Sequence, residues 1–388
     1  MKERKPLGLY VHIPFCRSKC DYCDFCSMVP NSSSVVEHYT DALILQMEDN
    51  SAKLRPYLID SVYIGGGTPT ALDEKRLARI IENIYRNFKI AKKAEYTVEA
   101  NPAPCEYHYF RRLRKLGVNR LSMGLQSVHD NELRALGRIH TFAEFKDTYA
   151  DARDAGFDNV NLDLMYGIPE QSEKSFSETL SAVTALEPDH ISMYALKIED
   201  GTPFAQRKDA LVLPDEDAQY SMYMNGVEYL ATRGFERYEI SNFARDGKYS
   251  QHNLKYWHCD EYFGLGAAAH SFIEGERIST TRNVRDFIDG LEVINSDINI
   301  IDSKTAVSGN ALMDEYVMLA MRLSQGINCA EFQQRFGVDF NEKYGVLLDD
   351  YINDGFVQKD DAGYRFTSQG MFVSNYILSD VLGLDVDA

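Results

Sequence analysis

The stretch that decides the fold runs from residue 16 to residue 23 and reads CRSKCDYC. Its cysteines, Cys16, Cys20 and Cys23, are separated by three and then by two residues. A cubane [4Fe–4S] cluster normally takes four thiolates, so a tight loop that supplies three leaves one iron with an open coordination position. The spacing therefore predicts a site-differentiated iron–sulfur cluster at which chemistry takes place.

Zinc binding, or a set of redox-active thiols, is the alternative interpretation of this loop. Zinc usually takes a fourth protein ligand and favours pairs of Cys-x2-Cys, a pair that the loop supplies only once. A further cysteine, Cys26, follows Cys23 by three residues. We predict that Cys26 is a bystander thiol near the cluster and not one of its ligands.

Together with the preceding residues 10–15, YVHIPF, the loop resembles the radical S-adenosylmethionine (SAM) family of oxygen-independent coproporphyrinogen III oxidase-like proteins. The resemblance implies that the amine and carboxylate of SAM chelate the open iron. It also implies that an electron from the cluster splits the sulfonium to give a 5′-deoxyadenosyl radical, while the protein supplies ligands, orientation and shielding. The decarboxylating members carry an additional cysteine two residues after the third ligand, a pattern from which Cys26 departs.

The length of the chain and its cysteine content indicate a globular protein of a reducing compartment. The 388 residues, 44% of them hydrophobic, suffice for one large domain and a smaller one. No apolar run approaches the roughly 18 residues that a membrane-spanning helix requires, although peripheral membrane association stays open. Seven cysteines, four of them between residues 16 and 26, suit a reducing compartment, so we expect a cytoplasmic protein. The isolated Cys105, Cys259 and Cys329 are expected to be core or surface residues.

The net charge of the chain argues against a nucleic-acid partner. A formal net charge of −18 repels phosphate backbones, and no basic stripe with interleaved aromatic residues offsets it. We therefore expect no nucleic-acid partner, and a porphyrin, another small molecule or a protein as the target.

Apolar, β-branched runs alternate with stretches of helical spacing, which is typical of repeated βα units. The predicted strands are 7–13, 61–64, 95–100, 120–125, 159–165 and 190–195. The predicted helices are 35–54, after cap candidates at 32–34, then 74–88, 105–116, 142–155 and 175–186. We expect an α/β fold, and the resemblance implies a partial (β/α)6 TIM-type barrel. A flat doubly wound sheet is the runner-up.

Residues suited to ligand binding follow the ends of the predicted strands, where barrel enzymes carry their sites. Three successive glycines, 65–67, follow the second strand and let the backbone approach a ligand closely; a tight turn is the alternative. Glu99 ends the third strand, where a buried carboxylate needs a cation or hydroxyls as partners.

The resemblance implies nine SAM-contacting positions. They are Tyr10, Tyr22, Gly66, Gly67, Thr68, Glu99, Gln126, Arg138 and Asp163. Arg138 is able to pair bidentately with a carboxylate. The alternative for Arg138 is a helix-surface arginine that bridges to an acidic residue, and the alternative for Asp163 is an internal salt bridge with that same arginine.

Residues 252–257 read HNLKYW and contain the only tryptophan of the chain. They match the His-Asn-x-x-Tyr-Trp motif of the heme chaperone (HemW) branch of the family. Because a neutral imidazole is able to bind heme iron, the resemblance implies that His252 is a heme ligand. A hydrogen-bonded structural histidine is the alternative.

The remaining segments complete the domain prediction. Residues 215–234 read as one helix, and helices at 310–323 and 340–354 precede a hairpin at 356–366 and a last helix. That outline is winged-helix-like, and its acidic character favours packing or partner contact over DNA binding. We predict a radical SAM barrel at 1–240, a barrel-closing region at 241–304 and a winged-helix-like α+β domain at 305–388.

Three functions stay open. The first is a heme chaperone that holds heme and delivers it to an acceptor hemoprotein, with a small electron-donor protein as a further partner. The second is an oxygen-independent coproporphyrinogen III dehydrogenase, and the third is another radical SAM enzyme acting on a tetrapyrrole. The short segment of 15 residues ahead of Cys16 and the motif at His252 favour the chaperone. Whether SAM is cleaved productively, and so whether the chain is an enzyme, stays open.

Overall fold

Six parallel strands form the centre of the molecule, of which the computed structural model describes residues 4–102, 106–293 and 296–384. The strands are β1 (Lys5–Ile13), β2 (Tyr57–Gly66), β3 (Ile90–Ala100), β4 (Arg120–Gln126), β5 (Val160–Tyr166) and β6 (His190–Ala195). They are hydrogen-bonded in chain order. A doubly wound sheet reverses its strand order at a switch point, so the sequential order rejects the runner-up and confirms the partial barrel.

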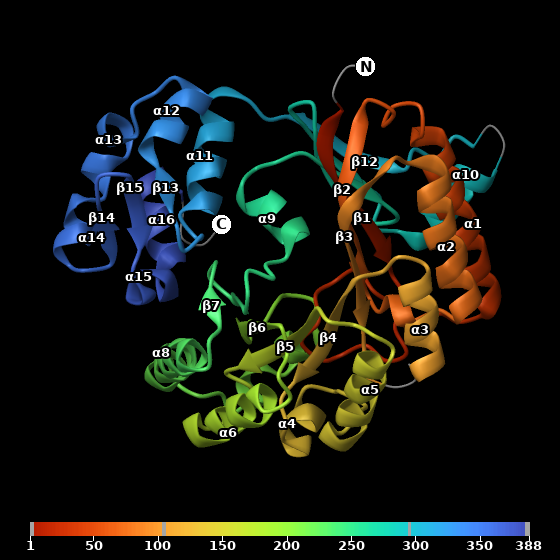
Figure 1. Ribbon diagram of the computed structural model, residues 1–388, viewed down its shortest axis with the longest axis horizontal. Helices are drawn as coiled ribbons and strands as arrows, with labels where there is room; N and C mark the ends of the chain where they lie inside the picture. The colour runs from red at the N-terminus through yellow and green to blue at the C-terminus, as the bar shows by residue number, and fades with distance from the viewer. Residues whose placement is uncertain (1–3, 103–105, 294–295, 385–388) are drawn as a thin grey trace.

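Helices cover the outer, convex side of this curved sheet (Figure 1). They are α1 (Ser33–Asn50), α2 (Glu74–Asn87), α3 (Tyr107–Lys115), α4 (Asp130–Ala135), α5 (Phe142–Asp154) and α6 (Glu173–Thr184). Local signals set their starts: the side chain of Asp73 caps α2 by accepting from Arg76 N, and Thr141 and Glu144 form a capping box on α5. Leu77, Ile80 and Ile84 lie at helical spacing and are fully buried.

Several predicted bounds need correction. The first helix ends at Asn50 and not at 54, since residues 51–56 form turns. Strands β2 and β3 begin earlier than predicted, because their first halves mix buried residues with polar or exposed ones such as Lys92 and Lys93 and lack a continuous apolar run. Helix α4 was not predicted. Cys105, the predicted start of the third helix, lies outside the described residues.

Side chains of alternate strand residues point into the barrel. On β1, Leu7, Leu9, Val11 and Ile13 belong to the hydrophobic core beneath the helices. The intervening residues face the interior, as do buried polar side chains of the other strands: Ser61, Glu95, Arg120, Asn161 and His190. The interior is therefore polar.

The strands between residues 236 and 306 extend the same sheet at both edges. At one edge, β8 (Asn242–Ala244) and β7 (Glu236–Arg237) continue from β6. At the other, β9 (Tyr262–Leu265) pairs with β1, followed by β10 (His270–Ile273), β11 (Glu276–Thr280) and β12 (Ile301–Ala306). The helices between β6 and β12 are α7 (Pro203–Gln206), α8 (Glu216–Thr232), α9 (Gln251–Trp257) and α10 (Val284–Glu292), with a 3-10 turn at Lys208–Ala210. Another 3-10 turn, Pro69–Ala71, follows β2. Helix α9 lies on the concave side of the sheet, facing the carboxyl-terminal domain (Figure 1). The predicted boundaries at 240 and 304 stay predictions.

The carboxyl-terminal part combines short helices with a three-stranded antiparallel sheet. Its elements are α11 (Gly309–Ala320), β13 (Ile327–Asn328), α12 (Cys329–Phe336), β14 (Val357–Lys359), β15 (Gly363–Phe366), α15 (Ser368–Phe372) and α16 (Ser374–Leu382). The predicted hairpin is confirmed. The single helix predicted at 340–354 is wrong. It is divided into α13 (Phe340–Lys343), a 3-10 turn at Gly345–Leu347 and α14 (Asp349–Asn353), where Gly345 packs closely against the Tyr364 hydroxyl.

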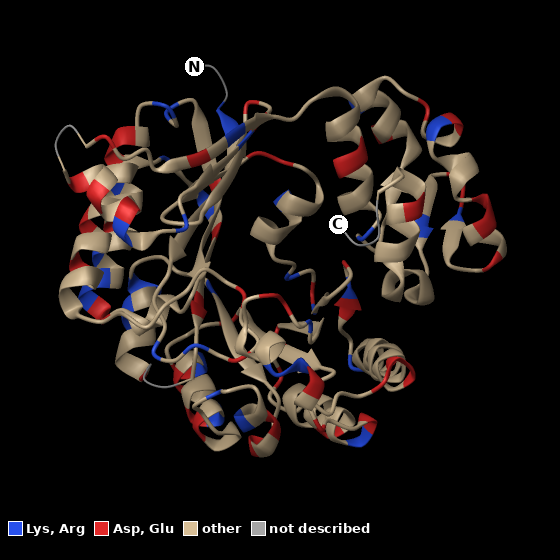
Figure 2. Cartoon of the chain, turned by 180° about the vertical axis from the view of Figure 1, so that it is seen from behind, with Lys and Arg blue, Asp and Glu red and all other residues tan. Residues whose placement is uncertain are grey.

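Charged side chains of both signs are spread over the outer helices and the carboxyl-terminal domain (Figure 2). Among the helices that the structure describes, none combines the length and apolar character needed to cross a membrane.

Candidate functional site

One cavity of about 130 Å³ lies where the carboxyl ends of the barrel strands meet. The three cysteines of the loop line it, together with eight of the nine positions predicted to contact SAM. Those eight are Tyr22, Gly66, Gly67, Thr68, Glu99, Gln126, Arg138 and Asp163. The structure thus brings together residues from four strand ends and two loops that are far apart in the sequence.

Tyr10 is the exception. It faces the barrel interior two residues before His12, and its hydroxyl is 3.0 Å from His12 Nδ1. Its ring lies 6.3 Å from that of Tyr63, measured between centroids. His12 lies nearer the strand end, so the structure does not place Tyr10 at the cavity wall.

Backbone hydrogen bonds hold the cysteine loop against the strand ends. Cys16 N donates to Met28 O at 2.9 Å, and Met28 N donates to Pro14 O at 2.7 Å. Further along, Asp21 N donates to Leu136 O at 3.1 Å, next to α4. The loop is therefore fixed at both ends before any ligand binds.

The glycines after β2 are required by close packing. Gly66 has a φ of +112°, in the region that favours glycine, and a Cβ there would clash with the His12 ring. A Cβ at Gly67 would lie 2.8 Å from Phe15 O and 3.0 Å from Cys16 Sγ. These contacts with protein atoms support the tight-turn interpretation, and the approach of the backbone to a ligand stays a prediction.

A chain of hydrogen bonds connects two of the thiols. Thr68 Oγ1 lies 3.7 Å from Cys16 Sγ and accepts from Asn101 Nδ2 at 2.7 Å. On the other side, Arg138 Nη2 donates to Asn101 Oδ1 at 2.8 Å, and Arg138 Nη1 donates to Cys20 Sγ at 3.5 Å. The sequence analysis missed Asn101 as a site residue. Asn101 follows Glu99 by two residues, so both side chains lie on the same face at the end of the strand. This spacing could have predicted that Asn101 belongs to the site.

The two carboxylates of the cavity have neutral partners. Glu99 accepts from the Tyr63 hydroxyl at 2.8 Å and from Gly66 N at 3.1 Å. Burial, opposed by the hydrogen bond from Tyr63, raises the pKa of Glu99 to about 7, and Asp163 adds to the rise. Asp163 accepts from Asn161 Nδ2 at 2.7 Å, and burial raises its pKa as well. Both carboxylates are therefore available to a cation or to hydroxyl groups of a ligand.

Arg138 does not form the alternative ion pair. Of the ion pairs between described residues, none joins Arg138 to Asp163; the second Nη of Arg138 instead also donates to Gly124 O at 2.5 Å. The guanidinium is thus held beside the cysteine loop by neutral acceptors and a thiol.

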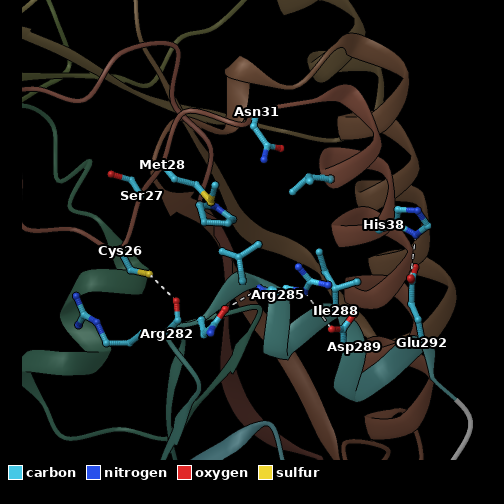
Figure 3. Close-up of a pocket in the computed structure, with 14 residues that line it drawn as sticks. Cys26, Ser27, Met28, Asn31, His38, Arg282, Arg285, Ile288, Asp289 and Glu292 are labelled. Carbon is cyan, nitrogen blue, oxygen red and sulfur yellow. Dashed lines mark hydrogen bonds and ion pairs between the residues drawn. The ribbon is translucent and has the colours of Figure 1, made fainter. Parts of the chain in front are cut away.

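Cys26 belongs to a different cavity. Its thiol donates to Arg282 O at 3.3 Å, on the side of the loop that faces α1 and α10 (Figure 3). Within the described ranges, no three His, Cys, Asp or Glu side chains gather as they would around a single metal ion. The loop therefore lacks the compact donor set of a mononuclear zinc site.

His252 lies inside the barrel, at the end opposite the cysteine loop. Only 1% of its surface is exposed. Its Nδ1 is 3.0 Å from Ser61 Oγ and its Nε2 is 2.9 Å from the Tyr256 hydroxyl. Burial lowers the pKa of His252 to about 3, so the imidazole is neutral. Both ring nitrogens are occupied, and a heme iron reaches neither unless α9 moves. Heme ligation by His252 stays a prediction.

Contacts from two domains hold α9. Glu95 on β3 accepts from Gln251 N at 2.9 Å and from His252 N at 3.0 Å, which caps the start of the helix. Arg335 of the carboxyl-terminal domain donates to His258 O at 2.7 Å and to Cys259 O at 2.9 Å, at its end. The helix therefore couples the barrel to the carboxyl-terminal domain.

We expect Glu95→Ala to lower the free energy of unfolding by about 2 kcal/mol, because two backbone donors at a helix start lose a charged acceptor. The measurement is urea denaturation followed by circular dichroism. Lys93→Ala, at an exposed position of the same strand, is the control and should leave the midpoint unchanged. Equal midpoints for both variants would contradict the capping role.

Comparison with known proteins gives the same assignment from end to end. Residues 10–183 match the radical SAM superfamily, and residues 307–373 match the HemN C-terminal domain. The heme chaperone HemW of Bacillus subtilis (strain 168) is 33% identical over 377 residues, which cover 96% of this chain and 98% of that protein. The heme chaperone HemW of Escherichia coli (strain K12) is 33% identical over 383 residues, 97% of this chain and 98% of that one.

The chain belongs to the HemW family. The resemblance drawn from the cysteine loop and the HNLKYW segment is thereby confirmed, and with it the radical SAM superfamily, which implies a [4Fe–4S] cluster and SAM as cofactors. Among solved structures, coproporphyrinogen III oxidase (HemN) from Escherichia coli has the same fold as this chain. The TM-score is 0.86 at 24% identity, and the match covers 97% of this chain and 90% of that one.

Proposed function

We propose that this chain is a heme chaperone, which binds heme and transfers it to acceptor hemoproteins. The observation that carries the proposal is the identity to proteins named heme chaperone HemW, 33% over 96% of the chain for the Bacillus subtilis relative. That similarity spans the barrel, α9 and the carboxyl-terminal domain. It therefore supports a heme-chaperone function that involves the whole chain. The partners that we propose are heme, an acceptor hemoprotein and a small electron-donor protein, in the cytoplasm.

We further infer that Cys16, Cys20 and Cys23 hold the cluster. Three thiols line one cavity, and the hydrogen bonds from Thr68 and Arg138 are the kind of outer contacts that tune cluster sulfurs. When bound, the cluster supplies an electron and an open iron position for SAM. Tyr22 lies between two of these ligands in sequence and lines the same cavity, so its ring would shield the nucleoside.

The other residues of the cavity would bind and orient SAM. Glu99 and Asp163 would accept hydrogen bonds from the SAM amine and from ribose hydroxyls, since neither forms an ion pair within the described part of the chain. Gly66 and Gly67 let the backbone approach the ligand, and Gln126 adds an amide from the end of β4. The backbone of Gln126 has a positive φ of 74°, a strained conformation of the kind that concentrates at functional sites.

Asn101 is expected to set the potential of the cluster through Thr68 and Arg138. In Asn101→Ala both side chains lose the partner that holds them toward the thiols, so the reduced, more negative cluster is stabilised less. We expect the midpoint potential to become more negative, as measured by redox titration followed by EPR. Asn101→Asp keeps an acceptor for Arg138 and is the comparison. An unchanged potential in Asn101→Ala would contradict this role.

A second candidate is oxygen-independent coproporphyrinogen III dehydrogenase. The observation in its favour is the cavity itself, which brings eight expected SAM-contacting positions to the three cysteines. Binding and transferring heme does not itself require residues that bind SAM beside the three cysteines, whereas radical decarboxylation does.

One experiment separates the two functions. The reconstituted protein is incubated anaerobically with SAM and a reductant, with either coproporphyrinogen III or heme. We expect stable heme binding and transfer of that heme to an apo-hemoprotein, without decarboxylated product. Protoporphyrinogen formed over many turnovers would reject the chaperone proposal in favour of the dehydrogenase.

A further inference from the structure

A second cavity, of about 640 Å³, lies outside the barrel beside the cysteine loop. The loop after β1, the first half of α1 and α10 form its walls (Figure 3). Its apolar lining residues are Pro14, Met28, Val35, Val284 and Ile288. Ligand pockets commonly enclose about 300–1,000 Å³ with mainly apolar walls and a few placed polar groups. The remaining lining residues are polar or charged and include Asp289 and Glu292. The cavity therefore has the size for a flat ring system and apolar walls on part of its lining.

Cys26 presents a half-buried thiol to one end of this cavity (Figure 3). Besides the bond from its thiol to Arg282 O, its own carbonyl accepts from His12 Nε2 at 2.8 Å. The His12 contact fixes the Cys26 backbone against β1. A cysteine thiolate is one of the established ligands of heme iron, and this thiol does not line the cavity of the other three cysteines.

Two guanidinium groups border the same cavity. Arg282 takes part in none of the ion pairs among the described residues. Arg285 pairs only with Asp289, at 3.5 Å, and 87% of its side chain is exposed. Both arginines are therefore able to turn toward an anionic ligand. Paired carboxylates such as heme propionates suit guanidinium groups, which bind carboxylates through parallel hydrogen bonds.

A third cavity, of about 580 Å³, is the competing place for heme. It lies between α9 and the carboxyl-terminal domain and includes the thiol-bearing Cys259. Asp314 and Glu315 also line it, and Arg277 is already paired with Glu315 at 2.6 Å. Each cavity is lined by two carboxylates: Asp314 and Glu315 here, and Asp289 and Glu292 beside Cys26. The cavity beside Cys26 has two guanidinium groups against one here, so the charges oppose a dianionic ligand less strongly beside Cys26.

We propose that the cavity beside Cys26 is the heme-binding site, with the Cys26 sulfur as an iron ligand and with Arg282 and Arg285 paired to the propionates. The inference rests on the proposed function as a heme chaperone. When ferric heme binds, the Cys26 thiol releases its proton to solvent and an iron–sulfur bond forms, with no change of oxidation state. The arginines lie at the protein surface, which leaves the propionate edge accessible to an acceptor.

The test titrates ferric heme anaerobically into the full-length, cluster-loaded protein and records the difference spectrum and EPR of the bound heme. We expect Cys26→Ser to weaken binding at least about tenfold and to lose the signature of thiolate-ligated iron. Arg282→Gln should weaken binding about three- to tenfold with an unchanged spectrum, because only a propionate contact is lost. Cys329→Ser, which removes a partly exposed thiol of the carboxyl-terminal domain, is the matched control and should behave as wild type.

Three results would overturn the site. One is a wild-type spectrum and affinity in Cys26→Ser. Another is a spectral change found in Cys259→Ser but not in Cys26→Ser, which would place heme in the third cavity. The third is loss of the cluster in Cys26→Ser, which would assign the thiol to the cluster. If wild-type protein itself bound no heme, the proposed function would fail along with the site, and that outcome is distinct from the other three.

Discussion

Cys16→Ser, Cys20→Ser and Cys23→Ser are each expected to abolish the iron–sulfur cluster, whereas Cys26→Ser retains it. The three thiols line one cavity at the strand ends, and Cys26 faces another. A cubane that loses one of only three protein ligands keeps too few thiolates to remain anchored. The measurement is iron and sulfide content with the visible absorption spectrum after anaerobic reconstitution.

Folding must be separated from cluster loss in this series. Circular dichroism of the apo-proteins should be the same for all four variants, because backbone hydrogen bonds such as Cys16 N to Met28 O hold the loop without metal. A Cys26→Ser protein without cluster, or a Cys23→Ser protein with a full one, would refute the assignment of three ligands.

The barrel and the cluster loop were predictable because their signals are local. Cysteine spacing is read directly from the chain, and the buried runs of β4 and β6 have no competing helical pattern. The single order of parallel strands then puts their ends together. Glu99 was predictable for the same reason: a carboxylate that ends an apolar strand needs partners, and Tyr63 provides one.

What the sequence left open depends on register and on contacts between distant segments. Tyr10 and His12 both face the interior, and only the depth of the barrel shows that His12 is nearer the strand end. His252 is followed by aromatic residues, but it is buried inside the barrel, where its Nδ1 contacts Ser61, 191 residues away in sequence. Likewise, Tyr364 packs against Gly345 and helps to end the helix predicted at 340–354, although it lies outside that segment.

Glu99→Gln is expected to weaken SAM binding about 100-fold while stabilising the ligand-free protein. The glutamine keeps a carbonyl that accepts from Gly66 N but loses the charge that strengthens a hydrogen bond from the SAM amine, and a charged hydrogen bond contributes roughly 1.5–3 kcal/mol. The dissociation constant of SAM for the cluster-loaded protein, measured by calorimetry, checks the first half of this expectation.

The expected stabilisation follows from the pKa of Glu99, which burial raises to about 7 from an ordinary value of 4.5. Between pH 4.5 and about 7, Glu99 is protonated in the folded state but ionised in the unfolded state. The contribution of Glu99 to folding stability is therefore fully present below pH 4.5 and is lost as pH rises through about 7. At about pH 8 the buried, ionised Glu99 lowers the free energy of unfolding by at most roughly 3 kcal/mol. Glu99→Gln removes this cost, so it should raise the melting temperature at about pH 8 and leave it nearly unchanged at about pH 5.

The same titration gives wild-type SAM affinity a pH dependence that the variant lacks. As pH falls through about 7, Glu99 takes up a proton and loses its attraction for a cation, so wild-type affinity should fall relative to that of Glu99→Gln. Because SAM itself titrates equally in both experiments, the ratio of the two dissociation constants isolates the carboxylate. Tyr63→Phe, which removes the donor at 2.8 Å that favours the charged form, should shift the midpoint of that ratio to higher pH. A ratio independent of pH would show that Glu99 carries no charge toward the ligand, and a downward shift in Tyr63→Phe would show that the Tyr63 hydroxyl is not what stabilises the charge.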